Sequence, residues 1–362
     1  MSEKAKESEK GNSNQLASFK RFSKKPLLII AFILLTVAVI AATAFSEFGN
    51  AENAANLAEV KMNFWLLIPA AVCFIVAIFL EIYKYVLMLR RAGHKKNGRK
   101  IWRVARRTVL LGKYYDNITP AGFGGQPFQI YYMHRHGEVS KGMATTIPLI
   151  GMVSNQLGFL IIAIMAIFFG GFLINNSTLV ATACFGLIFY AFWPVMILIA
   201  TFLPKATSEI ITILVRLLAK IHLVKNKNEA IRKAKESIAE SASSIKEVLK
   251  TKGLFFQTIS LSVLFHLLVS SIPYFVLTTF GGSVNFITCL FSTIAVTSAV
   301  YFIPTPGNAG AAEGTFYLVF SGLASGYTFW AMLVWRFFSY YAYIIAGPII
   351  YFRMHLEKKR VV

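Results

Sequence analysis

The sequence predicts an all-α polytopic membrane protein with about 7–8 transmembrane or re-entrant helices. Of its 362 residues, 56% are hydrophobic and only 15% are charged, whereas about a quarter of an average soluble domain is charged. Residues 142–204 contain no Asp, Glu, Lys or Arg, and residues 253–352 contain only Glu313 and Arg336. Because a helix needs about 20 apolar residues to cross a bilayer, each stretch is long enough for more than one span.

The positive charge is distributed as expected for a membrane protein. The net charge of +21 alone would also suit a nucleic-acid-binding protein. However, most of the 37 Lys+Arg lie next to apolar stretches, in residues 1–25, 90–107, 205–252 and 353–362. Such blocks mark the cytoplasmic side, so both termini are expected to be cytoplasmic. We therefore expect anionic lipid headgroups, and no nucleic acid, as partners of these blocks.

The alternation of apolar and basic segments divides the chain into two membrane halves. The expected parts are a disordered basic cytoplasmic tail at 1–25, a first membrane half at 26–204, a cytoplasmic amphipathic linker at 205–252, a second membrane half at 253–353 and a basic cytoplasmic tail at 354–362. The spans are expected near residues 27–45, 64–89, 144–174, 178–202, 254–280, 286–303 and 328–351.

Three further segments are predicted to be helices at the membrane surface or partly buried. Apolar residues recur at helical spacing over 210–221, which indicates an amphipathic helix in the interface. Residues 229–249 interleave Lys and Glu and predict a more polar helix. Residues 90–116 are basic and then mixed, which favours a partly buried helix.

The span at 64–89 carries two opposite charges near its cytoplasmic end. Glu81 and Lys84 are three residues apart, so they share one face of a helix. We expect a local ion pair that extends toward the membrane interface.

Two short motifs rich in Gly and Pro, at residues 117–128 and 304–314, interrupt the apolar pattern. Broken backbone at membrane depth leaves N–H and C=O groups that lipid cannot satisfy, so it survives only inside protein or against a wet cavity. Interrupted segments in corresponding positions of two halves point to the binding site of a transporter. The order span, span, broken segment, span occurs in both halves, which suggests two structural repeats with broken helices.

The two motifs and the nearby charges supply the candidate substrate-binding residues. Glycines can adopt turn conformations that other residues cannot adopt without strain. Helices that begin at each motif would point the positive ends of their dipoles at a phosphate. Glu313 and Arg336 are expected to pair, and we expect a lipid phosphate to replace Glu313 on Arg336. The full set is Thr119, Pro120, Gly124, Gly125, Gln126, Gln129, Pro306, Gly307, Asn308, Gly310, Glu313 and Arg336.

Nothing in the sequence points to catalytic residues, a metal or a cofactor. There is no Gly-x-Ser-x-Gly, no Walker sequence and no nucleophile–base pair. His134 and His136 lack an accompanying carboxylate or Cys cluster, so no metal is expected. Cys73, Cys184 and Cys289 lie in apolar stretches and are predicted to be small buried hydrophobic residues.

The motifs resemble the signatures of the lysylphosphatidylglycerol synthase membrane family. The resemblance covers residues 25–353, and many members carry an acid at the position of Gln126. The matching residues are Thr119-Pro120, Gly124-Gly125-Gln126-Pro127 and Tyr131-Tyr132 in the first motif, Pro306-Gly307, Gly310 and Glu313 in the second, and Arg336 in the following span. The resemblance implies a multi-pass, flippase-like domain in a bacterial cell membrane. Full-length synthases add a soluble domain that takes lysine from lysyl-tRNA, and we expect none here because the sequence ends shortly after its last span.

The resemblance implies a lipid translocase for an anionic or lysyl-modified phospholipid, such as lysyl-phosphatidylglycerol, or for a polyprenyl phosphate. Without an ATPase motif, movement would be ion-coupled or downhill. One alternative is a phosphatidylglycerol lysyltransferase-type enzyme or its membrane subunit, linked to resistance to cationic antimicrobial peptides, with acid–base residues such as Asp116 and His134. Another is a non-transporting partner that positions a separate lipid synthase through residues 205–252.

Overall fold

The computed structural model describes residues 41, 45, 62–93, 98–122, 124–170, 177–220, 226–250, 252–301, 303–321 and 327–359. The tail expected at 1–25 and nearly all of the span expected at 27–45 lie outside these residues.

Within the described residues every regular element is a helix, which confirms the all-α class. The long helices of the first half are α4 (Leu67–Arg91), α5 (Gly98–Ile118), α6 (Gly125–His136), α7 (Lys141–Gly170) and α8 (Ser177–Phe202). The linker forms α9 (Pro204–Lys220) and α10 (Lys227–Lys250), and the second half forms α11 (Lys252–Thr279), α12 (Phe286–Val300), α13 (Ala311–Phe320), α14 (Thr328–Arg336) and α15 (Ala342–Lys359). The short helical turns are η1 (Phe64–Leu66), η2 (Pro120–Gly122), η3 (Pro306–Asn308) and the π-helical turn η4 (Phe337–Tyr341).

Five helical segments of the described chain are long and apolar enough to cross a membrane. They are Phe64–Arg91, Gly142–Phe168, Val180–Phe202, Gly253–Thr279 and Thr328–Met354. These segments match five of the spans expected from hydropathy, because a stretch of about 20 apolar residues is stable across a bilayer only as a helix.

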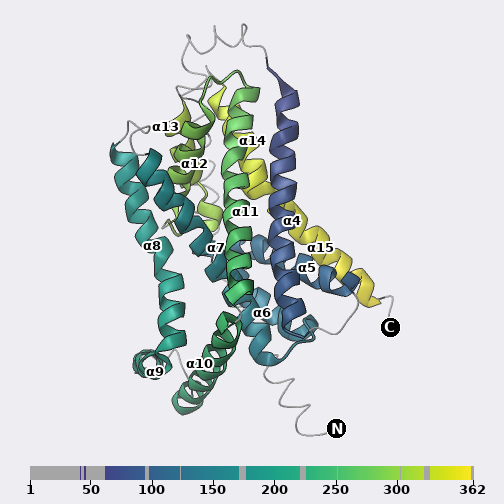
Figure 1. Ribbon diagram of the computed structural model, residues 1–362, viewed down its shortest axis with the longest axis vertical. Helices are drawn as coiled ribbons and strands as arrows, with labels where there is room; N and C mark the ends of the chain where they lie inside the picture. The colour runs from purple at the N-terminus through teal and green to yellow at the C-terminus, as the bar shows by residue number, and fades with distance from the viewer. Residues whose placement is uncertain are drawn as a thin grey trace.

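The helices pack into an upright bundle (Figure 1), and α4 takes part in its two largest buried apolar clusters. α4 packs along α11, which also contacts α7, and α12 packs against both α7 and α8. One buried apolar cluster joins α4 to α5, α6 and α7, and the other joins α4 to α11, α12, α13 and α14. The span α4 therefore links these two clusters.

α8 lies at the periphery of the bundle. Within the bundle it packs mainly against α7 and α12, so much of its surface points outward. Cys184 on α8 is exposed, and the prediction that all three cysteines are buried is wrong for this residue. Cys289 on α12 is buried as predicted, and Cys73 is partly buried.

The first motif forms the turn of a helical hairpin. α5 rises to η2, the chain reverses there, and α6 returns packed against α5. α5 buries Ile101, Val104 and Leu111 along one face, which confirms the partly buried helix expected in this region.

The second motif forms the turn of another hairpin, in which α12 and α13 pack together. The expectation of a full span at 286–303 is wrong, because α12 has 15 residues. At 1.5 Å per residue it is about 22 Å long, and a bilayer core is about 30 Å thick. α13 has 10 residues and returns beside α12, so the segment that contains Glu313 forms a short helical hairpin, and α13 alone is too short to span a bilayer.

The two hairpins enter the bundle from opposite ends. α5 and α6 lie in the lower half of Figure 1, whereas α12 and α13 lie in the upper half. Their tips, η2 and η3, pack against each other in the interior. This arrangement brings together two motifs that are separated by almost 180 residues in the sequence.

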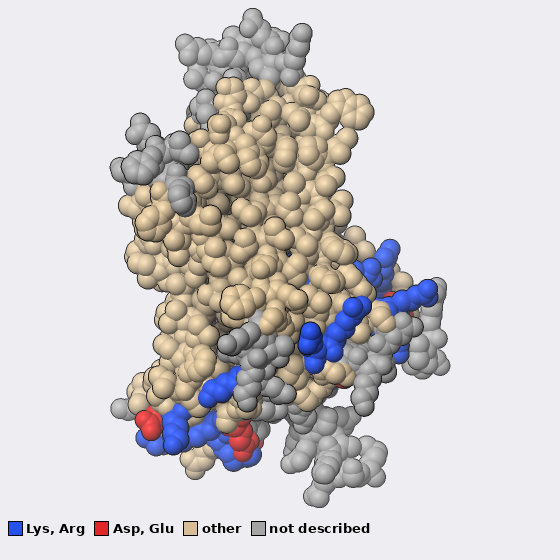
Figure 2. All heavy atoms as spheres, in the orientation of Figure 1, with Lys and Arg blue, Asp and Glu red and all other residues tan. Residues whose placement is uncertain are grey.

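Positive side chains gather at one end of the molecule. Figure 2 shows Lys and Arg over the lower end, where α9, α10, α5 and α15 lie, while the rest of this face is almost free of charge. α10 closes this end by packing against α7, α8 and α11, with Ala242 and Ile245 buried. α9 exposes Ile210, Ile213 and Leu217, as expected for an interfacial helix.

The close approach of α8 to α12 yields a stability prediction. A Cβ added at Gly186 would press against the backbone carbonyl of Ser298, whereas a Cβ added at Gly253 meets no atom within 4 Å. We expect Gly186→Ala to lower the free energy of unfolding by about 1–3 kcal/mol because the two helices must separate. Thermal unfolding in detergent checks this, with Gly253→Ala as the matched control. Equal unfolding temperatures for wild type and Gly186→Ala would contradict the packing.

Candidate functional site

The hairpin tips form one continuous site from residues of both motifs. η3 packs against η2 and also against α5. Gly307 has no room for a side chain, because a Cβ there would meet the ring of Tyr340 and lie 3.1 Å from Oδ1 of Asn117. The glycine therefore allows the second motif to approach the end of α5.

The first motif is held together by its own threonine. The hydroxyl of Thr119 donates to the carbonyl of Tyr115 at 2.8 Å and accepts from the N–H of Gly124 at 2.8 Å. Gly122 has φ of +65°, which favours glycine, and its N–H donates to the carbonyl of Thr119 at 3.2 Å. These bonds satisfy backbone groups that the break between α5 and α6 would leave unpaired.

A carboxylate from α5 occupies the N-terminus of α6. Oδ1 of Asp116 accepts from the N–H of Gly125 at 2.9 Å, at the positive end of the helix dipole. Asp116 lies outside the five candidate spans. Burial raises the pKa of its carboxyl to about 7, and the Lys113 cation and the Gly125 N–H partly offset this rise.

The second motif turns at three residues that have positive φ. Gly307, Asn308 and Gly310 have φ of +58°, +55° and +83°, in the region that favours Gly and, among other residues, Asn. The hydroxyl of Thr305 donates to the carbonyl of Ala309 at 3.0 Å and stabilises the loop. The last of these turns, at Gly310, starts α13.

Glu313 and Arg336 form a buried ion pair next to this turn. Nε of Arg336 lies 2.7 Å from Oε1 of Glu313, and the two side chains are 4% and 1% exposed. The other oxygen, Oε2, accepts from the N–H of Gly310 at 2.7 Å, and Nη2 of Arg336 donates to the carbonyl of Gly307 at 3.2 Å. The pair expected from the sequence therefore forms, and it also fixes the backbone of the second motif.

A π-helical turn follows Arg336 directly and positions an aromatic ring on it. In η4 the helix widens between α14 and α15. Tyr340, within this turn, lies with its ring centroid 4.8 Å from the guanidinium carbon, a cation–π contact. Such π turns inside α-helices are frequent at functional sites.

Most candidate residues belong to one of the two hairpin tips and make contacts within it. Arg336, Glu313, Gly310 and Gly307 are joined directly, and Pro306 belongs to the same turn. Thr119, Pro120, Gly124 and Gly125 form the opposing tip.

The three candidate amides fall into two groups. Gln126 and Asn308 are half-buried, and within the described residues their side chains have no hydrogen bond. Gln129 is 7% exposed, and its amide is engaged by the hydroxyl of Tyr85 and the carbonyl of Thr108. Gln126 and Asn308 are therefore the amides available to a ligand.

The structure adds two site residues that the sequence reasoning did not include. The sequence suggests Asp116 only as an acid–base residue of the enzyme alternative, and Tyr340 lies in an apolar span without any local signal. Asp116 lies nine residues before the start of α6. Its contact with that helix could be predicted only if the hairpin geometry were known.

The expectation for Glu81 and Lys84 needs a correction. The two residues form the expected ion pair, at 2.8 Å, but they do not extend toward the interface. Lys84 is 0% exposed and Glu81 is 5% exposed, because α7 and α11 pack over this part of α4.

The fold and the site define a polytopic α-helical membrane protein in which two helical hairpins meet beside a buried Arg–Glu pair. The family model of the lysylphosphatidylglycerol synthase TM region matches residues 27–347, nearly the whole chain. The protein belongs to this family, which relates it to lysylphosphatidylglycerol synthesis. A search of curated proteins found no match.

Removal of one member of the Glu313–Arg336 pair should be strongly destabilising. Glu313→Ala leaves a buried guanidinium without its counter-ion, and we expect a loss of about 3–5 kcal/mol in the free energy of unfolding. The double variant Glu313→Leu/Arg336→Met removes both charges and should lose less. Glu236→Ala, which breaks an exposed pair with Arg232, is the control and should change stability by only about 0.3–0.5 kcal/mol. Chemical denaturation measures all three, and equal losses for both Glu variants would contradict the buried pair.

The raised pKa of Asp116 predicts a pH-dependent stability. The folded state binds this proton up to about pH 7, whereas the unfolded state releases it near the ordinary value of 3.8. The contribution of Asp116 to stability is therefore largest below pH 4 and falls as the pH rises toward 7. We expect Asp116→Asn to gain thermal stability over wild type progressively across this window. An equal difference at pH 4 and at pH 8 would contradict the prediction.

Proposed function

We propose that the protein is a lipid translocase that moves a lipid with an anionic or lysyl-modified headgroup between the leaflets of a bacterial cell membrane. The substrates we consider are lysyl-phosphatidylglycerol, a related anionic phospholipid or a polyprenyl phosphate. The observation that supports this most is the meeting of two helical hairpins, from opposite ends of the bundle, beside Arg336. Paired broken segments of this kind form the substrate sites of transporters.

Arg336 has the chemistry of a phosphate receptor. Its guanidinium carries five N–H donors, of which Nε and one on Nη2 are engaged by Glu313 and Gly307. Nη1 has no hydrogen-bond partner within the described residues. A phosphate can bind there first and then take the place of Glu313, since Arg binds phosphate oxygens in a bidentate manner.

Neutral groups of both tips supply the remaining contacts. The amides of Gln126 and Asn308 offer donors and acceptors that suit glycerol or aminoacyl groups. The N-termini of α6 and α13 add positive dipole ends, once Asp116 and Glu313 release them. The headgroup is thus received by polar backbone and amides while the acyl chains stay in the lipid.

The enzyme alternative names Asp116 and His134 as acid–base residues, and the structure does not bring these two together as a pair. Asp116 contacts the first residue of α6, and His134 lies nine residues further along that helix. At 1.5 Å per residue this separates them by about 13 Å, too far to share a proton.

A leaflet-exchange assay tests the proposal. The purified protein is reconstituted in liposomes, and labelled phosphatidylglycerol, lysyl-phosphatidylglycerol and a polyprenyl phosphate are followed separately. We expect rapid exchange of at least one lipid, and at least a tenfold lower rate in Arg336→Lys, which keeps the charge but loses bidentate binding. Glu236→Gln on the exposed face of α10 is the control and should exchange at the wild-type rate.

The alternatives predict different results. Absence of exchange for every lipid, in protein shown to be folded, would contradict the translocase. Lipid modification by the purified protein would favour the enzyme. A requirement for an added lipid synthase, lost on changes in residues 205–252, would favour the positioning partner. Transfer of lysyl-phosphatidylglycerol to the outer leaflet would reduce its negative charge, which connects the function to resistance against cationic peptides.

A further inference from the structure

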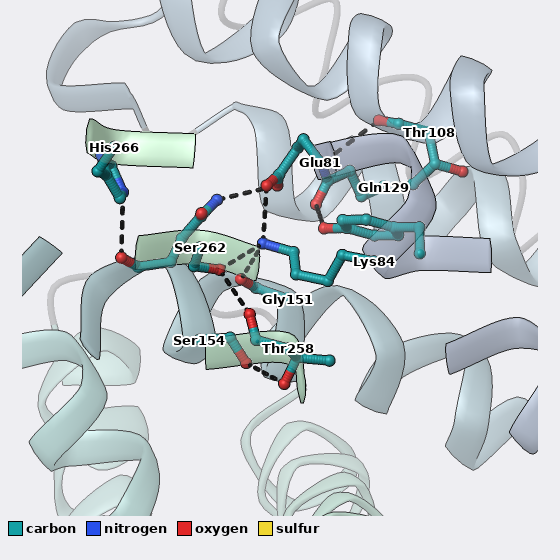
Figure 3. A network of polar contacts seen from close by, with 11 residues as sticks. Glu81, Lys84, Thr108, Gln129, Gly151, Ser154, Thr258, Ser262 and His266 are labelled. Atoms are coloured by element: carbon teal, nitrogen blue, oxygen red, sulfur yellow. Dashed lines mark hydrogen bonds and ion pairs between the residues drawn. The ribbon is translucent and has the colours of Figure 1, made fainter. Parts of the chain in front are cut away.

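A second buried charge cluster lies on α4, and the proposed headgroup site does not use it. Nζ of Lys84 lies 2.8 Å from Oε2 of Glu81, and it donates to Oγ of Ser262 at 3.1 Å and to the carbonyl of Gly151 at 3.3 Å. Figure 3 shows the ammonium at the centre of these contacts, where α4, α7 and α11 meet. We call Glu81, Lys84, Asn155 and Ser262 the α4 centre.

The α4 centre has a high desolvation cost if its only role is to hold the helices together. Two charges in an apolar span lose their hydration, and a well-packed apolar pair is often at least as stable. The exposed fractions of 0% for Lys84 and 5% for Glu81 show that neither group regains water at the surface. Ionisable residues at such positions therefore indicate a function.

Asn155 makes the centre suitable for both protonation states of Glu81. Its Nδ2 donates to Oε1 of Glu81 at 2.9 Å, which suits the carboxylate. Its Oδ1 is buried and has no hydrogen-bond partner within the described chain. Rotation of the amide would turn Oδ1 toward Glu81, where it can accept from the protonated acid.

Lys84 also keeps partners in both states. The hydroxyl of Ser262 and the carbonyl of Gly151 accept from its ammonium regardless of the charge on Glu81. The hydroxyl of Ser262 in turn donates to the carbonyl of Thr258, so its acceptor lone pairs face the lysine. The ammonium therefore stays solvated by protein when the carboxylate is neutralised.

Among the charged and titratable groups near the α4 centre, Glu81 is the carboxylic acid that belongs to it. Tyr85, Tyr190 and Tyr343 lie within electrostatic range of Glu81, and tyrosine is neutral at physiological pH. Lys113 on α5 and His266 on α11 lie within electrostatic range of Lys84, and His266 bonds the carbonyl of Asn155 at 3.2 Å. Asp116 acts on Tyr85, but it belongs to the tip of the first hairpin.

The centre is connected to the first hairpin through the next residue of α4. Tyr85 donates to Oε1 of Gln129 on α6 at 3.1 Å, and Nε2 of Gln129 donates to the carbonyl of Thr108 on α5 at 3.3 Å. A shift of α4 at residues 81–85 therefore acts on both helices of the hairpin whose tip forms half of the headgroup site.

We propose that Glu81 is a proton-exchange site that couples lipid movement to proton movement across the membrane. In the step, the helices packed around Glu81 open to one side, and the carboxylate takes a proton from a hydronium ion there, which leaves water. An O–H bond forms, and the ion pair with Lys84 is lost while Lys84 keeps its own proton. Release to the other side restores the pair. The coupling rests on the proposed function, whereas proton exchange at Glu81 does not.

Infrared difference spectroscopy tests the exchange without any transport. Between acidic and alkaline buffer, wild-type protein in lipid should show a carboxylic acid C=O band of an apolar environment. Asp116 is also buried and protonates in this pH range, so its band remains in every variant. The contribution of Glu81 is the part of the band that is lost in Glu81→Gln and kept in Glu236→Gln, the exposed control. The double variant Glu81→Gln/Lys84→Met removes both charges, so it keeps the test valid if the single variant does not fold. A wild-type spectrum identical to that of the double variant would overturn the proposal.

Leaflet exchange under an imposed pH gradient tests the coupling. We expect the gradient to change the wild-type rate at least fivefold and to leave the rate of the double variant unchanged. An equal wild-type exchange rate with and without the gradient would overturn the proposed coupling, but it would not contradict the translocase function. Absence of all exchange would contradict the translocase, and the infrared spectra then decide the proton site alone.

Discussion

The structure depends on one constraint: backbone that is broken at membrane depth must find its hydrogen bonds within the protein or from water in a cavity, because lipid offers none. The two motifs satisfy it partly by local hydrogen bonds. The hydroxyl of Thr119 bonds two backbone groups in one tip, and the hydroxyl of Thr305 bonds the carbonyl of Ala309 in the other. The long-range part comes from Arg336, which binds the carbonyl of Gly307 and the carboxylate of Glu313 together. Without this side chain the second tip would lose a polar partner at the place where lipid offers none.

The same constraint explains why both tips carry an internal acid. Asp116 occupies the start of α6, and Glu313 bonds the N–H of Gly310 at the start of α13. Each helix N-terminus attracts anions, so each would bind an anion nonspecifically if it were left open. In the proposed function, an anionic headgroup has to compete with these internal acids, and such competition would favour a ligand that offers several contacts at once.

Much of the fold could be predicted from the sequence, because hydropathy directly reflects the cost of polar groups in lipid. Five described spans and the amphipathic helix α9 follow from apolar length and spacing. The 286–303 segment was misjudged because composition does not show where a helix reverses. The motifs themselves, and the pairing of Glu313 with Arg336, could be predicted because clusters of Gly with Pro and isolated charges stand out in apolar stretches.

The rest could not be predicted because it depends on contacts between distant segments. The burial of Lys84 arises from α7 and α11, which bring Gly151 and Ser262 to it across long sequence separations. The internal use of Gln129 likewise requires Tyr85 and Thr108 to be in place. A local pattern can name such residues, but only the packing decides whether they face a ligand or the protein.

The central claim is that Arg336 receives a lipid phosphate between the two hairpin tips. Solid-state NMR with labelled arginine, which measures nitrogen–phosphorus dipolar coupling in native lipid, tests this directly. The account predicts a coupling at hydrogen-bond range that is assigned to Arg336 by its loss in Arg336→Lys, and that strengthens in Glu313→Gln. An Arg336 guanidinium coupled to no phosphorus in either protein, with the transported lipid present, would contradict it.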